Sequence, residues 1–146
     1  MSEDIIQANP ANNANIQLAN TLSINDDKGR NRVIRAINNA DSLAEDLGLG
    51  VVFEVVDVLQ KPGVRLGRNG MPDVPCTDTY LLCANGKCYL TKSDGIANDV
   101  LTILAIYGGA FRGEDGRGLL CVVGEKKTGN GNTIKRLYTV DPDELD

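Results

Sequence analysis

The sequence contains no histidine and no tryptophan, and aromatic residues make up only 4% of its 146 residues. Histidine is the most frequent general base in enzymes and the most frequent metal ligand, so its absence argues against hydrolases, transferases and most zinc enzymes. No nucleophile with a matching base can be assembled from the remaining residue types. We therefore expect a protein that is not an enzyme.

Long apolar runs are also missing from the sequence. No stretch approaches the roughly 18 apolar residues that a membrane span needs. The first ten residues, MSEDIIQANP, are acidic and lack the basic-then-apolar order of a secretory signal. We therefore expect a cytoplasmic protein with no membrane partner.

The net charge of −5 conceals three unlike segments. Residues 1–27 carry four acids and no base, and residues 141–146 also carry four acids and no base. All fifteen Lys and Arg residues lie in 28–140 together with twelve acids, which gives this body a charge of +3. A basic body suits a polyanionic partner, whereas an acidic tail repels anions, recruits other proteins or is simply solvated.

The chain is long enough for one domain with one core of ordinary size. Residues 1–28 are rich in Asn and Ala without a hydrophobic period, which predicts a flexible arm. A nucleic-acid-binding domain is then expected at 29–140, followed by an acidic tail at 141–146.

Hydrophobic periodicity and turn residues define the expected elements of the domain. They are a strand at 31–38, a short helix at 41–48, a strand at 51–60, a long mobile loop at 61–75, two strands around Asn85-Gly86, a helix at 93–109, and strands at 118–127 and 132–140. In the strand at 51–60, alternation places Phe53, Val55 and Leu59 on one face and Val56 and Val58 on the other.

The stretch YLLCANGKCYL, residues 80–90, has the strongest hairpin signal in the chain. A two-residue Asn-Gly turn would place Cys83 opposite Cys88, and both cysteines would face the core. Tyr80, Tyr89 and Lys87 would then share the opposite face. Such a face can stack nucleic-acid bases, at about 1–3 kcal/mol per base, although tyrosine pairs on strands also serve as ordinary packing.

The four cysteines show no Cys-x-x-Cys spacing typical of zinc ribbons. In a reducing cytoplasm we expect buried, reduced thiols that act as small apolar side chains. We therefore expect no metal and no cofactor. A zinc site, a redox module or a cross-strand disulfide between Cys83 and Cys88 are the alternatives to this interpretation.

From residue 51 onward the expected order is three strands, a helix and two strands. This order predicts a mainly β (α+β) protein with an OB-like, five- to six-stranded Greek-key barrel and a helix between the third and fourth barrel strands. An unrelated α+β roll would have the same order. In an OB domain, the loops at 61–75 and 128–132 would frame the binding face.

Basic residues gather near these two loops and beside the tyrosines. Each alone is typical of a solvated surface, but together they form a candidate nucleic-acid site. The candidate residues are Tyr80, Tyr89, Lys87, Lys92, Lys61, Arg65, Arg68, Lys126, Lys127, Lys135 and Arg136.

The chain from about Asn31 to Val140 resembles the single-stranded DNA-binding proteins of small tailed phages that start DNA replication from a protein primer. The resemblance rests on NNADSLAEDLGLGVVFEVVDVL, TDTYLLCANGKCYLTKS, IANDVLTILAIYG and GLLCVVGEKKTGNGNTIKRLYTV. It implies an OB-like protein that coats and protects displaced single strands during phage DNA replication. The family varies in oligomeric state, which leaves self-association open for this chain. The tail DPDELD separately resembles the acidic ends of many single-strand binders, which recruit partner proteins, and this implies a contact with replication proteins.

The leading hypothesis is therefore sequence-independent binding of single-stranded DNA. The alternative is a small phage inhibitor or adaptor that binds a host protein, which the acidic ends and the low aromatic content favour.

Overall fold

The computed structural model describes residues 21 and 26–145 of the chain. Its elements, in chain order, are α1 (Asp27–Asn39), β2 (Asp41–Ser42), the π-helical turn η2 (Leu43–Leu47), β3 (Phe53–Arg65), β4 (Val74–Cys83), β5 (Cys88–Thr91), α2 (Asp94–Ile106), β6 (Leu119–Lys127), β7 (Thr133–Thr139) and the 3-10 turn η3 (Pro142–Leu145). The predicted arm at 1–28 lies mostly outside the described residues, and its last two residues begin α1. None of the described helices combines the length and the apolar character needed to cross a membrane.

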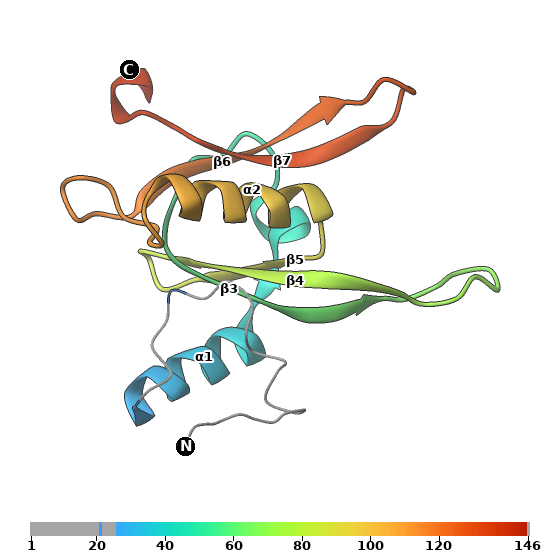
Figure 1. Cartoon of the computed structure of the whole chain (residues 1–146), viewed down its shortest axis with the longest axis horizontal. Helices are drawn as coiled ribbons and strands as arrows, with labels where there is room; N and C mark the ends of the chain where they lie inside the picture. The colour runs from blue at the N-terminus through green and yellow to red at the C-terminus, as the bar shows by residue number, and fades with distance from the viewer. Residues whose placement is uncertain (1–20, 22–25, 146) are drawn as a thin grey trace.

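The strands form one mixed sheet in the order β2-β5-β4-β3-β6-β7. β2 and β5 run parallel, and all other neighbours are antiparallel. The sheet curls strongly into a half-barrel, and α2 lies inside the curl against β7 and β4 (Figure 1). The prediction of a mainly β protein with a barrel-like sheet is confirmed at this level.

The sheet buries apolar side chains on both of its faces. The inner core, between the sheet and α2, includes Val55, Leu81, Val100 and Phe111. The outer core, between the sheet and α1, comprises Val33, Ala36, Leu59, Tyr80, Leu82 and Cys88. Both helices are therefore held by an apolar stripe, as amphipathic helices usually are.

The prediction of a strand at 31–38 is wrong, because these residues belong to α1. The side chain of Asp26 caps the helix by accepting a hydrogen bond from the Gly29 amide at 2.7 Å. Gly29, Val33 and Ala36 are buried, and their spacing of four and three residues is that of one helix face.

β3 contains a bulge that the sequence does not predict. Val55 pairs with Cys83, whereas Asp57 pairs with Leu82, so the register shifts between Val55 and Asp57. The predicted faces are correct for Phe53 and Val55 and are reversed for Val58 and Leu59. Val58 joins Val55 in the inner core, and Leu59 lies in the outer core.

The prediction of a long mobile loop at 61–75 is also wrong for most of that segment. β3 continues to Arg65 and pairs with β4 up to Val74, which leaves residues 66–73 as the turn. The paired ends project from the body as a long ribbon (Figure 1).

The other predicted elements are confirmed. The helical turn η2 is capped by Ser42 and ends at Gly48, whose φ is +82°. α2 begins after Ser93, whose hydroxyl accepts a hydrogen bond from the Ile96 amide at 3.2 Å. β6 and β7 form the hairpin that was expected at 118–140.

Candidate nucleic-acid interface

The turn between β4 and β5 contains three residues rather than the expected two. The Cys83 amide donates to the Lys87 carbonyl at 2.8 Å, and the Gly86 amide donates to the Cys83 carbonyl at 3.0 Å. Gly86 has a φ of +90°, which glycine adopts without strain. Leu82 therefore pairs with Cys88, and the predicted register is wrong by one residue.

A shift of one residue moves side chains to the opposite face of a strand. Tyr80 lies in the outer core and Tyr89 in the inner core, with only 3% and 6% of their surfaces exposed. The Tyr89 ring packs edge-on against Phe53, with 6.2 Å between ring centroids. The prediction that the two tyrosines share an exposed face with Lys87 is wrong.

The same shift separates the cysteines. Cys83 lies in the inner core with Cys121, whereas Cys88 lies in the outer core. All four cysteines are free thiols. Burial raises the pKa of Cys83 to about 11 and the pKa values of Cys88 and Cys121 to about 12. These three thiols therefore stay protonated at neutral pH and behave as apolar side chains. Within the described residues, no cluster of Cys, Asp and Glu could hold a metal ion.

Two of the predicted bases are held by a buried carboxylate. The ammonium groups of Lys61 and Lys92 lie 3.2 and 2.7 Å from the carboxylate of Asp78, whose side chain is only 7% exposed. The hydrogen bond to Asp78 raises the pKa of Lys92. Lys61 also lies 6.0 Å from the centre of the Tyr80 ring, which is within range of a cation–π contact. Both lysines therefore neutralise the buried carboxylate of Asp78 at the base of the β3–β4 ribbon.

Four further predicted bases are spread over the molecule. Arg136 on β7 pairs with Asp99 on α2 and so holds that helix to the sheet. Lys126 and Lys127 are exposed at the end of β6, and Arg68 is exposed in the turn of the β3–β4 ribbon. These residues do not meet Tyr80 or Tyr89 on one face.

A groove of about 490 Å³ lies between α1 and the β4–β5 turn. We call it the α1 groove. Its basic side chains are Arg32, Arg35 and Lys87, and its lining is completed by Ala36, Asn39, Asp41, Val56, Leu82, Cys83, Gly86 and Cys88. It combines three cations with a largely apolar floor.

Sequence reasoning missed Arg32 and Arg35 because residues 31–38 were interpreted as a strand. The bases Lys28, Arg32 and Arg35 recur with the spacing of one helix face. This period, together with the cap at Asp26, is the signal that could have found them.

The guanidinium group of Arg32 is anchored while it remains half-exposed. It donates to the carboxylate of Asp57 at 3.1 Å, and Asp57 also accepts from the Thr21 hydroxyl at 2.7 Å. In the part of the chain that the structure describes, neither Arg35 nor Lys87 forms an ion pair. Two of the three cations in the α1 groove are therefore available to an anion.

A second hollow of about 590 Å³ borders edge strand β2, and we call it the edge hollow. Its basic side chains are Arg65, Lys92 and Lys135. Asp41 lines both the α1 groove and the edge hollow, so the two are contiguous. We call the pair the basic track; it carries six bases and the single acid Asp41. Arg65 is oriented by its hydrogen bond to the Lys92 carbonyl at 2.7 Å.

The basic track has the properties of a site for a polyanion with apolar groups. Cations spaced along a surface bind successive phosphates, and an apolar floor receives bases or sugars. Among the described residues no aromatic ring lines the track, but a guanidinium plane can stack on a base as an aromatic ring does. No family model, no curated protein and no solved structure matches this chain.

Proposed function

We propose that this protein binds single-stranded DNA without sequence preference and that the strand follows the basic track. The observation that carries the proposal is that the α1 groove and the edge hollow adjoin at Asp41 and together are lined by six basic side chains. Three of these, Arg35, Lys87 and Lys135, form no ion pair among the described residues, whereas Arg32, Arg65 and Lys92 pair with Asp57, Asp94 and Asp78. The resemblance to phage replication proteins supports a role in coating and protecting displaced strands.

The sheet order is compatible with an OB-type barrel. In chain order, β3, β4, β5, β6 and β7 would be its five strands, and α2 lies between the third and the fourth of them. OB domains bind oligonucleotides on the face of their second and third strands. On this assignment those strands are β4 and β5, and the α1 groove lies on them.

Single strands suit the track better than duplexes do. The floor residues Leu82 and Cys88 are buried below the arginines of α1. A single strand can turn its bases toward such a floor, whereas a duplex keeps them stacked inside the helix. The contact with the phosphates would then depend on Arg35 and Lys87 at the rim.

Fluorescence anisotropy with labelled oligo-dT over a range of salt concentrations tests the proposal. We expect affinity to fall with salt, and Arg35→Ala and Lys87→Ala should each reduce the log–log slope by about 0.7. Arg112→Ala is the matched control, because this guanidinium group is exposed outside the track. Absence of oligo-dT binding at low salt would refute the function. Equal losses in the Arg112 and Arg35 variants would refute the track.

A protein-binding adaptor is the second candidate function. The exposed apolar side chains of Leu66 and Met71 on the projecting ribbon favour it, because such side chains often mark protein contacts. A pull-down that retains one host protein after nuclease treatment, combined with no affinity for oligo-dT, would favour this candidate over DNA binding.

A further inference from the structure

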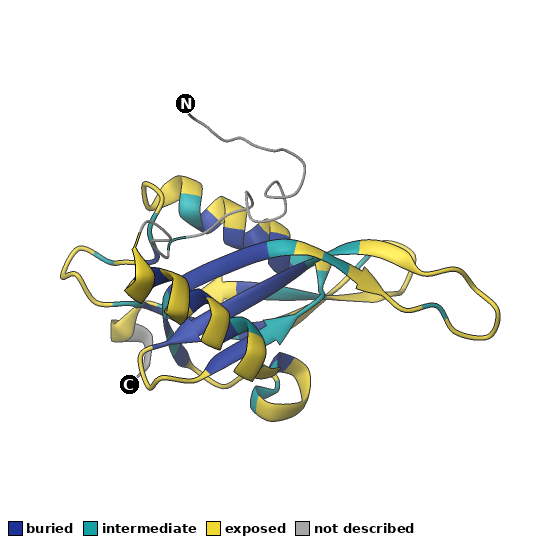
Figure 2. Cartoon of the chain, turned by 90° about the horizontal axis from the view of Figure 1, so that it is seen from below, coloured by how far each residue is buried: buried dark blue, intermediate teal, exposed yellow. Residues whose placement is uncertain are grey.

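The turn of the β3–β4 ribbon exposes large apolar side chains at the far end of the molecule. Leu66 is 74% exposed and Met71 is 69% exposed, with Val64 and Val74 exposed beside them. Apart from Gly67, which is partly buried, residues 64–74 at the projecting end of the ribbon are exposed (Figure 2). We call residues 64–74 the ribbon tip. Apolar groups held so far from any core mark a contact surface.

The ribbon tip has a fixed local structure. The Gly67 amide donates to a carboxylate oxygen of Asp73 at 2.7 Å, and the Met71 amide donates to the Arg68 carbonyl at 3.0 Å. A Cβ atom at Gly67 would lie 1.9 Å from the Met71 carbonyl oxygen, so only glycine fits there. Residues 64–74 hold two bases, Arg65 and Arg68, and one acid, Asp73, so the tip has a net charge of +1. Among the described residues Arg68 forms no ion pair. The tip therefore presents an apolar pair beside a net positive charge.

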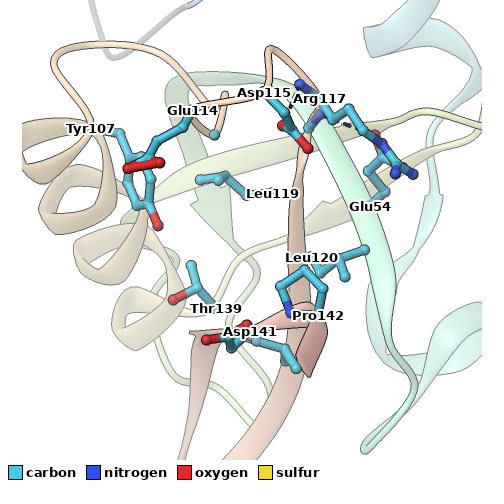
Figure 3. Close-up of a pocket in the computed structure, with 13 residues that line it drawn as sticks. Glu54, Tyr107, Glu114, Asp115, Arg117, Leu119, Leu120, Thr139, Asp141 and Pro142 are labelled. Carbon is cyan, nitrogen blue, oxygen red and sulfur yellow. Dashed lines mark hydrogen bonds and ion pairs between the residues drawn. The ribbon is translucent and has the colours of Figure 1, made fainter. Parts of the chain in front are cut away.

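A hollow with the opposite properties lies at the other end of the molecule. It has a volume of about 590 Å³, and we call it the acidic hollow (Figure 3). Leu119, Leu120 and Val140 supply its apolar lining, and Tyr107 stands at its rim. Its charged side chains are Glu54, Glu114, Asp115, Asp141 and Arg117.

The charge of the acidic hollow is only partly compensated. Arg117 lies 3.7 Å from Glu54, whose carboxylate also accepts from the Gly118 amide at 3.0 Å. Asp115 accepts from the Arg117 amide at 3.0 Å. Glu114 is exposed and forms no ion pair within the described part of the chain. The hollow therefore keeps negative charge beside its apolar wall that one further cation can neutralise.

We propose that the ribbon tip of one copy docks into the acidic hollow of a second copy. Arg68 would face Glu114 and Asp115, while Leu66 and Met71 would cover Leu119 and Leu120. Tip and hollow match in both charge and apolar character, which identifies a second copy of this chain as the occupant. The turn of the β3–β4 ribbon and the segment 113–118, which lines the hollow, lie at opposite ends of the chain's longest axis, so the tip of one copy cannot reach its own hollow (Figure 1).

The contact joins two different surfaces and is therefore head-to-tail. Such contacts do not close by twofold symmetry and link copies into rings or open rows. A tip in a hollow buries little area, so we expect weak, concentration-dependent association in free solution. If the proposed function holds, neighbouring copies on one DNA strand would reach a high effective concentration and bind cooperatively.

Sedimentation velocity of the full chain without DNA, from about 10 µM to about 1 mM, tests the docking. We expect the mean mass to rise with concentration. A tip variant, Leu66→Ser with Met71→Ser, should remain monomeric, and so should a hollow variant, Glu114→Lys with Asp115→Lys. Ile34→Ser is the control for loss of an exposed aliphatic side chain outside both surfaces, and it should associate as the unmodified chain does.

An equimolar mixture of the tip and hollow variants provides the decisive measurement. One intact tip and one intact hollow remain, so the mixture should form a heterodimer and no larger species. Replacing Arg68 by Glu in the hollow variant should restore association, because the charges are exchanged. A monomeric chain at about 1 mM, or association that both variants retain, would overturn the proposal.

Two further outcomes separate this docking from other possibilities. In one, the tip variant loses binding to vesicles of phosphatidylglycerol and phosphatidylcholine while it self-associates as the unmodified chain does. That result would overturn the docking in favour of a lipid surface. Short oligo-dT, long enough for one copy only, should bind the tip and hollow variants as it binds the unmodified chain. Failure of DNA binding with intact self-association would refute the proposed function and leave the docking in place.

Discussion

The carboxylate of Asp99 on α2 accepts hydrogen bonds from the guanidinium group of Arg136 on β7, one of them at 2.8 Å. The same carboxylate accepts from the buried Leu137 amide at 2.9 Å. These contacts raise the pKa of Arg136, chiefly through the hydrogen bond to Asp99. One buried acid thereby ties the inner helix to the last strand.

The Asp99→Ala substitution should destabilise the fold by about 2–3 kcal/mol, because the Leu137 amide would be left buried without an acceptor. The free energy of unfolding, measured by urea titration and circular dichroism, checks this expectation. Glu125→Ala removes an exposed acid and is the control, with an expected change below about 0.5 kcal/mol. Equal effects of the two substitutions would show that the contacts of Asp99 with Arg136 and the Leu137 amide do not stabilise the fold.

The buried thiols should make the protein sensitive to alkali. In the folded chain the pKa values of Cys83, Cys88 and Cys121 are about 11, 12 and 12, against an ordinary value of 9.0. Above pH 9 the unfolded chain loses these protons first, so the free energy of unfolding falls as the pH rises toward 12. Urea titrations between pH 8 and pH 11 should show this fall, and Cys121→Ala should make it shallower. Parallel pH profiles for the two proteins would show that Cys121 does not contribute.

Gly95, in the first turn of α2, sets the distance between this helix and β7. A Cβ atom there would lie 2.4 Å from the Lys135 carbonyl oxygen, which is backbone and cannot rotate away. We expect Gly95→Ala to cost about 1–3 kcal/mol in the free energy of unfolding, since packed elements must separate to admit it. Gly129→Ala is the matched control because no atom lies within 4 Å of its Cβ position. A Gly95→Ala protein as stable as the Gly129→Ala protein would show that α2 adjusts freely.

The sequence predicted elements whose signals are local. Ser93 and Gly48 mark helix ends by their own chemistry, and the β6–β7 hairpin follows from β-branched residues around a glycine-rich turn. The β3 bulge and the three-residue turn at Gly86 depend on pairing between strands, which a single strand does not encode. Each shifts the register by one residue and thereby reverses the faces of the side chains that follow it in the same strand, which is β3 for the bulge and β5 for the turn.

The candidate site was predicted less well for the same reason. Of the residues proposed from the sequence, Lys87, Arg65, Lys92 and Lys135 lie along the basic track. The two tyrosines lie on opposite faces because the turn is one residue longer than expected, and both are buried because each face of the sheet carries a packed core. Arg32 and Arg35 enter the site only because α1 folds back over β4 and β5, which is a tertiary relationship.

Asp26 should control how firmly α1 covers the outer core. Its carboxylate caps the helix at the Gly29 amide, and replacing such a cap by alanine costs about 1 kcal/mol. α1 covers Cys88, whereas Cys83 and Cys121 lie in the inner core.

In a Cys76→Ser background, Asp26→Ala should raise the labelling rate of Cys88 by an uncharged thiol reagent about fivefold, because local opening becomes that much more frequent. Mass spectrometry of the labelled peptides measures the three rates separately. Ser93→Ala weakens the cap of α2 instead and should leave the Cys88 rate unchanged. A uniform rise at all three cysteines in the Asp26→Ala protein would mean that α1 does not open independently, since only global unfolding exposes both cores together.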